Sequence, residues 1–424
     1  MVAWLALVVR LQAGEMIEDP LRPGQFVFVA GTGTGVMYLR ALSVLLLVGA
    51  GIVAVNARRP AKLASYWLPV LALSLVYALS WYLRSFSHFL EVVYSGITPE
   101  TPIVWMLLFA TVARPDRSWS KRELAFLSGL TYLTLGLSWY HSISLPQFGS
   151  VRHAGVSPST YFTVAAFWPS VFLLFKDEQP RWLGSAFQRL PIFLCLGLSV
   201  YSRSRGWTLL ALLAIAIRFA LDVRRGQVAR YFAIWLLTGF AVAVLASYQT
   251  DRLVGNLEGL IQRLDQDTRT EQYSAFFAQM SFADLVVGAG PGSKYVLGDQ
   301  TFSWIDNQYL AVLMKFGAPV LAGYFVLVLL PGLRQLSRWR TTTVLPEALT
   351  ILLWCLALVG VSTYNAIDLT PQNILICWMG GRCAAAWKLK EVMEGVPRLS
   401  PYRTKPSNGD EVQMNRVRHK RLVS

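Results

Sequence analysis

The chain has 424 residues, of which 54% are hydrophobic and only 15% are charged. Ordinary soluble domains carry about 25% charged residues, so this composition excludes a soluble domain and predicts a polytopic membrane protein. The formal net charge of +15 does not predict a nucleic-acid partner, because in a membrane protein the positions of the basic residues matter more than their number.

Apolar blocks that approach the length of a membrane span follow one another along most of the chain. They lie near 39–57, 64–83, 102–113, 124–141, 159–175, 190–202, 206–222, 231–247, 308–330, 346–363 and 371–387. Residues 1–12 are apolar but short, and residues 13–37 would follow them as an external loop. We predict an all-α polytopic integral membrane protein with about 11–12 transmembrane helices and one long external loop.

Arginine and lysine cluster on alternate connections between these blocks. They are Arg58, Arg59 and Lys62; Arg114, Arg117, Lys121 and Arg122; Lys176, Arg181 and Arg189; Arg224, Arg225 and Arg230; and Arg334, Arg338 and Arg340. The positive-inside rule places these connections and both termini in the cytoplasm. We predict N-terminal spans over 1–147, a membrane domain over 148–387 with an external loop at 248–303, and a basic, mostly disordered tail over 388–424.

The four cysteines lie within or at the ends of apolar blocks: Cys195, Cys355, Cys377 and Cys383. They show neither CxxC nor Cys/His spacing, so they support no metal site and no disulfide framework. We expect these side chains to fill the core, and we expect no metal or cofactor.

A few arginines fall on external connections, against the positive-inside bias. They are Arg152, Arg203, Arg205, Arg263 and Arg269. Each alone is explained by a long side chain that anchors a helix end, or by a loop ion pair. Together they point to an anion, because the guanidinium fork matches phosphate oxygens and several such forks would hold a pyrophosphate without a metal.

The external loop ends in a glycine-rich turn, GAGPGS, and then in Asp306 and Asn307 before the next apolar block. No βαβ pattern surrounds the turn, so we interpret it as close-packed rather than as a dinucleotide-binding fingerprint. Asp306 is a candidate general base for a sugar hydroxyl, and the alternative is a helix N-cap. The aromatic side chains of Tyr273, Trp304 and Tyr309 suit either sugar stacking or an interfacial aromatic belt.

Four segments resemble the O-antigen ligase and O-antigen/exopolysaccharide polymerase family, in the family's order. They are RHAGVSPSTYFTVAAF, SRSRGWTLLALLAIAIRFAL, RTEQYSAFF with LVVGAGPGS, and DNQYLAVLMKFGAPVLAGYFVLVLL. The resemblance covers about 150–387. It implies a polytopic glycosyltransferase that uses a lipid-pyrophosphate-linked sugar at the outer face of the bacterial inner membrane.

Residue by residue, Arg205 and Arg269 match the two pyrophosphate arginines of that family. Asp306 stands where the ligases place a catalytic histidine, which favours the polymerase branch, and Ser159 replaces a frequent asparagine. The resemblance further implies substrate-binding residues, which are Arg152, Arg203, Arg263, Asn307, Tyr309 and Gly290. The implied partners are a polyprenyl-pyrophosphate-linked oligosaccharide as donor and acceptor, membrane lipid, and polysaccharide export or chain-length-control proteins.

Other functions stay open at this point. One is a ligase that transfers polysaccharide to another acceptor, and another is a transporter or flippase of lipid-linked sugars. A third is a non-catalytic partner in polysaccharide export. Transporters usually carry mid-membrane charges and broken helices, whereas the predicted spans are nearly free of charge away from their ends. We therefore favour the enzyme.

Overall fold

The computed structural model describes part of the chain. The described residues are 14–18, 26–30, 119–144, 158–176, 182–201, 205–226, 232, 269–290, 293–302, 305, 307–340, 342–360, 375–384 and 386. The chain divides into two units, Met1–Ala386 and Trp387–Ser424, and every described residue belongs to the first. The predicted basic tail, the blocks near 1–12, 39–57, 64–83 and 102–113, and most of 231–247 lie outside the described residues.

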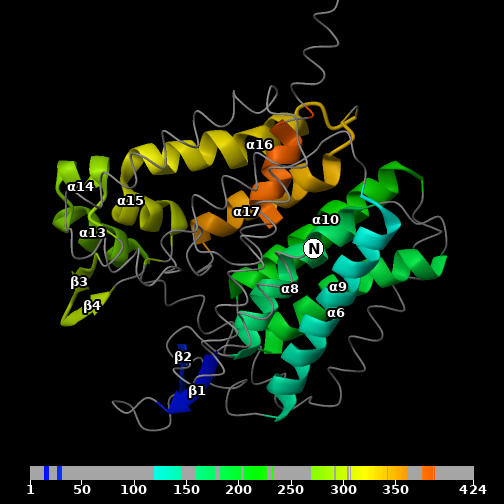
Figure 1. Cartoon of the computed structure of the whole chain (residues 1–424), viewed down its shortest axis with the longest axis horizontal. Coiled ribbons are helices and arrows are strands. Elements are labelled where there is room, and N and C mark those ends of the chain that lie inside the picture. The colour runs from blue at the N-terminus through cyan, green and yellow to red at the C-terminus, as the bar shows by residue number, and fades with distance from the viewer. Residues whose placement is uncertain are drawn as a thin grey trace, which may run out of the picture. The chain divides into compact units, whose positions relative to one another are not determined.

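The described part is mostly helical, as predicted (Figure 1). Four helices occupy the predicted blocks between 124 and 222: α6 (Lys121–Ser144), α8 (Pro158–Phe175), α9 (Trp182–Tyr201) and α10 (Arg205–Arg224). Helix α6 begins with a capping box, in which the Ser120 hydroxyl accepts from the Glu123 amide at 3.2 Å and the Glu123 carboxylate accepts from the Ser120 amide at 2.8 Å. These helices have 18 to 24 residues, or about 27–36 Å at 1.5 Å per residue.

The apolar block predicted near 308–330 is helical, but the helix is broken at Gly317. Helix α15 (Gln308–Tyr324) contains Gly317 with a φ of 80°. Pro319 follows, and it has no amide hydrogen to give to the carbonyl of Lys315 four residues earlier, so the helical ladder fails there. A left-handed φ is readily adopted by glycine, which lets the chain change direction at this point (Figure 1).

The chain continues from this break as a π-helical turn, η3 (Phe325–Leu329), and α16 (Leu330–Leu336), and later forms α17 (Leu345–Gly360). Two tyrosines on opposite sides of the break approach the same turn of α17. The Tyr309 hydroxyl donates to the Cys355 carbonyl at 3.3 Å, and the Tyr324 hydroxyl accepts from the Trp354 indole at 2.8 Å. A straight helix would separate positions 309 and 324 by about 22 Å, so these contacts fit a sharp bend.

Two small antiparallel hairpins correct the all-α prediction. Strand β1 (Gly14–Glu18) pairs with β2 (Phe26–Ala30), with Gly14 opposite Ala30, inside the predicted external loop 13–37. Strand β3 (Tyr295–Leu297) pairs with β4 (Gln300–Phe302), with Tyr295 opposite Phe302. The second hairpin has the two-residue turn Gly298–Asp299, and Gly298 takes the positive φ of 59° that such turns favour.

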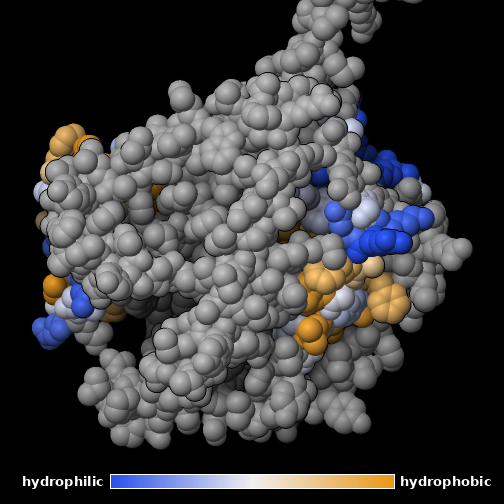
Figure 2. Space-filling model, viewed as in Figure 1, coloured by the Kyte–Doolittle hydropathy of each residue, from blue (hydrophilic) through white to orange (hydrophobic). Residues whose placement is uncertain are grey.

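Many apolar side chains of the helices point outward. Segment Gly206–Arg224 of α10 is long and apolar enough to cross a membrane and is only 33% buried. Its exposed residues include Leu209 at 63% and Leu212 at 47% exposure. Figure 2 shows apolar side chains gathered over α14 and, beside a strip of hydrophilic ones, in the region of α6 and α9. Shorter apolar helices lie at Ala166–Phe175, Phe187–Val200 and Leu345–Val359.

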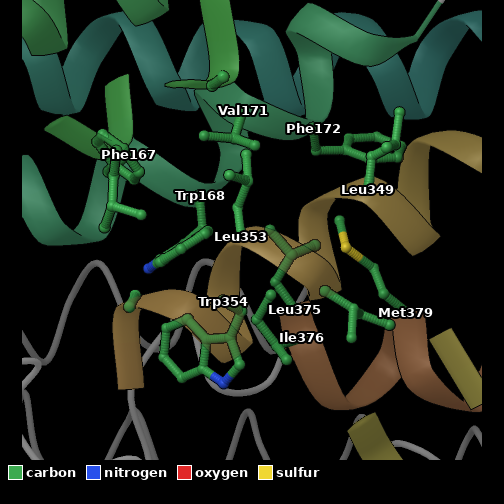
Figure 3. Close-up of a cluster of buried hydrophobic side chains, with 14 of the residues drawn as sticks. Phe167, Trp168, Val171, Phe172, Leu349, Leu353, Trp354, Leu375, Ile376 and Met379 are labelled. Carbon is green, nitrogen blue, oxygen red and sulfur yellow. The ribbon is translucent and has the colours of Figure 1, made fainter. Parts of the chain in front are cut away.

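Helix α8 lies at the centre of the main core, packed against α6, α9 and α17 (Figure 3). Trp168 makes an edge-to-face contact with Trp354 of α17 at 4.8 Å between ring centroids, and Phe167 makes one with Trp207 of α10 at 4.8 Å. Such aromatic pairs add about 0.5–1.5 kcal/mol each beyond the burial of their surface. Three of the four cysteines, Cys195, Cys377 and Cys383, are buried free thiols, so their predicted role as core side chains is confirmed.

Buried serine and threonine side chains satisfy their hydroxyls within their own helices. Each donates to the carbonyl four residues earlier, at 2.7 or 2.8 Å; they are Thr131, Thr134, Ser138, Ser170, Ser199 and Thr350. This pattern removes the need for water or a distant partner. It therefore suits helices in an apolar environment.

Candidate functional site

The predicted external loop is more than a polar connection, because the described residues within 269–316 fold into a small unit, here called the loop unit. It contains α13 (Arg269–Gln279), α14 (Phe282–Val287), the β3–β4 hairpin and the first part of α15. Its apolar core consists of Phe276, Tyr295, Ile305, Ala311 and Met314. The Gln279 carboxamide joins α13 to the hairpin, since it donates to the Val296 carbonyl at 2.6 Å and accepts from the Val296 amide at 2.8 Å.

The glycine-rich turn after α14 packs on the break in α15, as the close-packed interpretation predicted. The Ala289 amide donates to the Met314 carbonyl at 2.6 Å, and the Gly290 amide donates to the Lys315 carbonyl at 3.1 Å. The second bond replaces the donor that Pro319 cannot supply. The backbone of Gly290, which was expected to bind substrate, thus holds the break in α15.

Two glycines make this contact possible. A Cβ on Gly288 would lie 2.6 Å from the Lys315 carbonyl oxygen, and a Cβ on Gly317 would lie 2.7 Å from the Gly288 nitrogen. Both residues also have φ values in the left-handed region, 88° and 80°. The turn after α14 and the bend in α15 therefore meet backbone to backbone, and any side chain at either glycine would separate them.

Asn307, rather than Asp306, caps α15. The Asn307 side-chain oxygen accepts from the Tyr309 amide at 3.0 Å and from the Leu310 amide at 3.3 Å. Asparagine is among the best N-cap residues. Asp306 lies outside the described residues, but the cap that was weighed as its alternative role belongs to its neighbour.

We expect Asn307→Ala to destabilise the protein by about 0.5–2 kcal/mol, because two amides at the start of α15 would lose their acceptor. Thermal unfolding of the purified protein in detergent measures this change. Asn307→Asp is the matched control, since it keeps a short side-chain acceptor and should unfold near the parent temperature. An alanine variant as stable as the parent would show that the cap contributes little.

Only some of the predicted arginines can be placed. Arg269 is the first residue of α13 and is half-buried, and Arg205 is the first residue of α10. A cation at a helix start opposes the helix dipole, and it shares that position with backbone amides that attract an anion. Arg152, Arg203 and Arg263 lie outside the described residues, as does the Arg205 side chain.

The loop unit brings the start of α13 and the start of α15 into one core. Tyr273, one turn after Arg269, and Phe276 pack in the same cluster as Ile305 and Leu310, which flank the Asp306–Asn307 pair. Positions four apart share a helix face, so Arg269 and Tyr273 lie on the same side of α13. Of the other two predicted aromatic contacts, Tyr309 is half-buried and bonded to α17, and Trp304 lies outside the described residues.

Sequence reasoning missed a buried charge cluster that joins three helices. Asp222 of α10 accepts from Arg189 of α9 at 2.7 Å and from Arg218 at 2.8 Å, and all three side chains are at most 2% exposed. Arg218 also donates to the carbonyl of Phe175, the last residue of α8, at 3.4 Å. The signal available in the sequence was the four-residue spacing of Arg218 and Asp222 within an apolar block.

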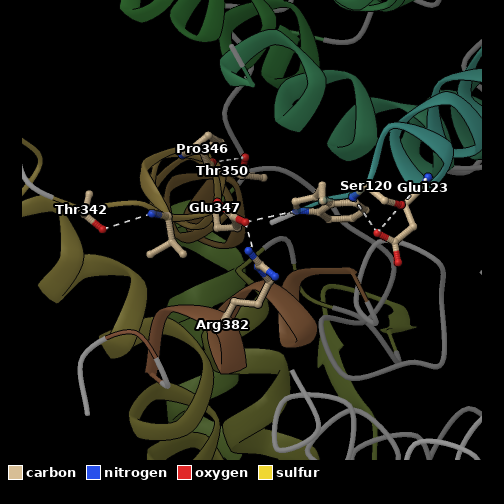
Figure 4. A network of polar contacts seen from close by, with 9 residues as sticks. Ser120, Glu123, Thr342, Pro346, Glu347, Thr350 and Arg382 are labelled. Carbon is tan, nitrogen blue, oxygen red and sulfur yellow. Dashed lines mark hydrogen bonds and ion pairs between the residues drawn. The ribbon is translucent and has the colours of Figure 1, made fainter. Parts of the chain in front are cut away.

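A second buried network joins the segment before α6 to α17 and to helical residues 375–384 (Figure 4). Glu347 is fully buried, and one of its oxygens accepts from Arg382 at 2.9 Å and from the Trp119 indole at 3.2 Å. Nearby, the Gln335 side-chain carboxamide donates to the Cys383 carbonyl at 2.9 Å.

These contacts gather the helix ends that carry the basic connections. The two buried networks both reach the end of α8, because Arg218 donates to the Phe175 carbonyl and the Trp119 ring contacts Phe172 at 4.8 Å between ring centroids. They involve the starts of α6, α9 and α17 and the ends of α8, α10 and α16. All of these ends were predicted to face the same side of a membrane. The buried charges also lie within a few turns of helix ends.

Among the described residues, no three His, Cys, Asp or Glu side chains come together as a metal site. In the loop unit, Arg269 stands at the start of α13, and the Asp306–Asn307 pair precedes α15. No family model matches the chain, and no curated protein matches it.

Proposed function

We propose that the chain is a polytopic membrane protein of the bacterial inner membrane, with both termini in the cytoplasm and the loop unit outside. The exposed apolar face of α10, the hydroxyls satisfied within their helices, and the shared location of the basic helix ends support this proposal. Antiparallel helices of about 30 Å with apolar exteriors suit a bilayer.

The function we propose is glycosyl transfer that joins lipid-pyrophosphate-linked oligosaccharide units into a cell-surface polysaccharide. The observation that carries it is the core of the loop unit, which includes both Tyr273, one turn after Arg269, and Ile305, the residue before the Asp306–Asn307 pair. A folded unit can hold a cation for the pyrophosphate and a base for the acceptor in fixed relation, which catalysis requires. The resemblance to O-antigen polymerases supports the same choice.

The proposed reaction is one displacement at the anomeric carbon. An acceptor hydroxyl oxygen forms a bond to that carbon, and its proton passes to the Asp306 carboxylate. The bond from the anomeric carbon to the pyrophosphate oxygen breaks, and the lipid pyrophosphate leaves with the electron pair. Arg205 and Arg269 stabilise the charge that develops on the leaving group.

We expect Arg269→Ala to remove most activity while leaving the protein folded, because the pyrophosphate loses a charge-assisted bidentate contact of about 1.5–3 kcal/mol. The assay is lengthening of a lipid-pyrophosphate oligosaccharide by purified protein in detergent. Arg269→Lys should restore little, since lysine keeps the charge without the fork. Lys294→Ala, which removes an exposed cation from the same loop unit, is the control and should keep full activity.

Near-parent activity in Arg269→Lys would contradict a bidentate contact with the pyrophosphate and would leave Arg269 only the role of anchoring a helix end.

The assay also separates the enzyme from the second candidate function, a flippase of lipid-linked sugars. The break in α15 favours this candidate because transporters use discontinuous helices. A flippase would move lipid-linked sugar across vesicles and would produce no longer chains in detergent.

A further inference from the structure

The outward face of α14 is entirely apolar. Four of its six residues are exposed, namely Phe282, Ala283, Val286 and Val287, and Phe282 is 82% exposed. At about 100° per residue they fill one continuous arc of about 140°. Leu285 packs toward the core of the loop unit, and Asp284 is used in the capping box with Ser281. This face is unusual in a loop that carries more acidic than basic residues.

The position of α14 relative to the bend in α15 indicates what covers this face. The turn directly after α14 is fastened to residues 314–317 of α15 by the two amide bonds and the glycine pair. The helical run that starts after Gly317 continues to Leu336, about 28 Å at 1.5 Å per residue, which matches the hydrocarbon thickness of a bilayer. Its far end is the basic end, where Gln335 bonds to Cys383, Arg334 lies in the last turn of α16 and Arg338 follows the helix.

Gly317 therefore lies at the outer boundary of a membrane-crossing run, and α14 lies beside it. We propose that the Phe282–Val287 face of α14 is seated in the outer leaflet of the lipid bilayer, at the border of headgroups and hydrocarbon. An exposed aromatic ring with aliphatic neighbours is typical of interfacial helices. This inference rests on the membrane placement proposed above, and it assigns the loop unit a lipid contact rather than a purely aqueous setting.

The test uses a nitroxide label on single introduced cysteines in lipid vesicles. Three of the natural cysteines are buried and Cys355 is half-buried, so the unsubstituted protein gives the labelling background. Labels at Phe282→Cys and Val286→Cys report on α14. Ser274→Cys, exposed on α13, is the water-facing reference, and Leu209→Cys, exposed on α10, is the lipid-facing reference.

Collisions with oxygen, which concentrates in lipid, are compared with collisions with a water-soluble nickel chelate. We expect both α14 labels to shift from the ratio of the Ser274 label toward that of the Leu209 label. Nickel access at α14 equal to that at Ser274, with Leu209 still in lipid, would overturn the inference alone. Shielding of both α14 labels from both reagents would also overturn it and would indicate a protein partner. Nickel access at Leu209 would instead overturn the membrane placement.

Discussion

Replacing Asp306 by asparagine is expected to lower the turnover of the purified protein by about 10²–10⁴-fold without reducing its amount. Asparagine has nearly the same shape as aspartate but cannot take the proton of the acceptor hydroxyl. The start of α15 should be unaffected, because Asn307 supplies its cap. A loss of activity in Asp306→Asn would therefore report on chemistry and not on helix formation.

The same experiment includes two discriminating variants. Asp306→His places the ligase-type residue at this position and should retain part of the turnover, because imidazole can also act as a base. Asn307→Ala should lower the unfolding temperature more than Asp306→Asn does, because it removes the cap of α15. The assay runs with a chelator present. Full activity in Asp306→Asn would exclude the base, and a strict need for added divalent metal would count against catalysis by arginines alone.

The largest effect on stability is expected at Asp222. Asp222→Ala would remove the buried carboxylate to which Arg189 and Arg218 both donate, at 2.7 and 2.8 Å. Removing one partner of a buried ion pair costs about 3–5 kcal/mol, because the remaining charge is buried without compensation. We expect the variant to unfold at a much lower temperature in detergent or to fail to accumulate in membranes.

Asp299→Ala is the matched control, since Asp299 is exposed in the turn of the β3–β4 hairpin and surface changes usually stay within about 0.5 kcal/mol. A combined variant, with Arg189→Met, Arg218→Met and Asp222→Leu, should recover much of the lost stability, because apolar side chains of similar volume can replace a buried charge cluster. If Asp222→Ala unfolds at the same temperature as the parent protein, the cluster does not contribute to stability.

Helix positions and the grouping of helix ends could be predicted from the sequence because both depend on local composition. Apolar blocks mark helices whose sides face other apolar groups, and buried contacts join several of the helix ends that adjoin the basic connections. The charge cluster could not be predicted in full. The spacing of Arg218 and Asp222 is visible in the sequence, but their partner Arg189 lies on a different helix.

The candidate site was predicted less well, for the same physical reason. The sequence predicts that a helix starts near Asp306–Asn307, and the structure has one there. The N-cap is Asn307, because a shift of one residue along the chain changes which side chain reaches the first amides of α15. The sequence Gly-Ala-Pro is typical of a helix break near Gly317. The close backbone contact at the break also requires Gly288, which lies many residues earlier. Only packing brings these two glycines together.

The glycine pair has a mechanical consequence. With backbone against backbone at Gly288 and Gly317, no side chain is present there that could change rotamer and absorb a small displacement. A push on α14 is therefore transmitted directly to the bend in α15, and the loop unit and the outer end of that helix act as a single lever. We therefore expect the two segments to move together at this joint.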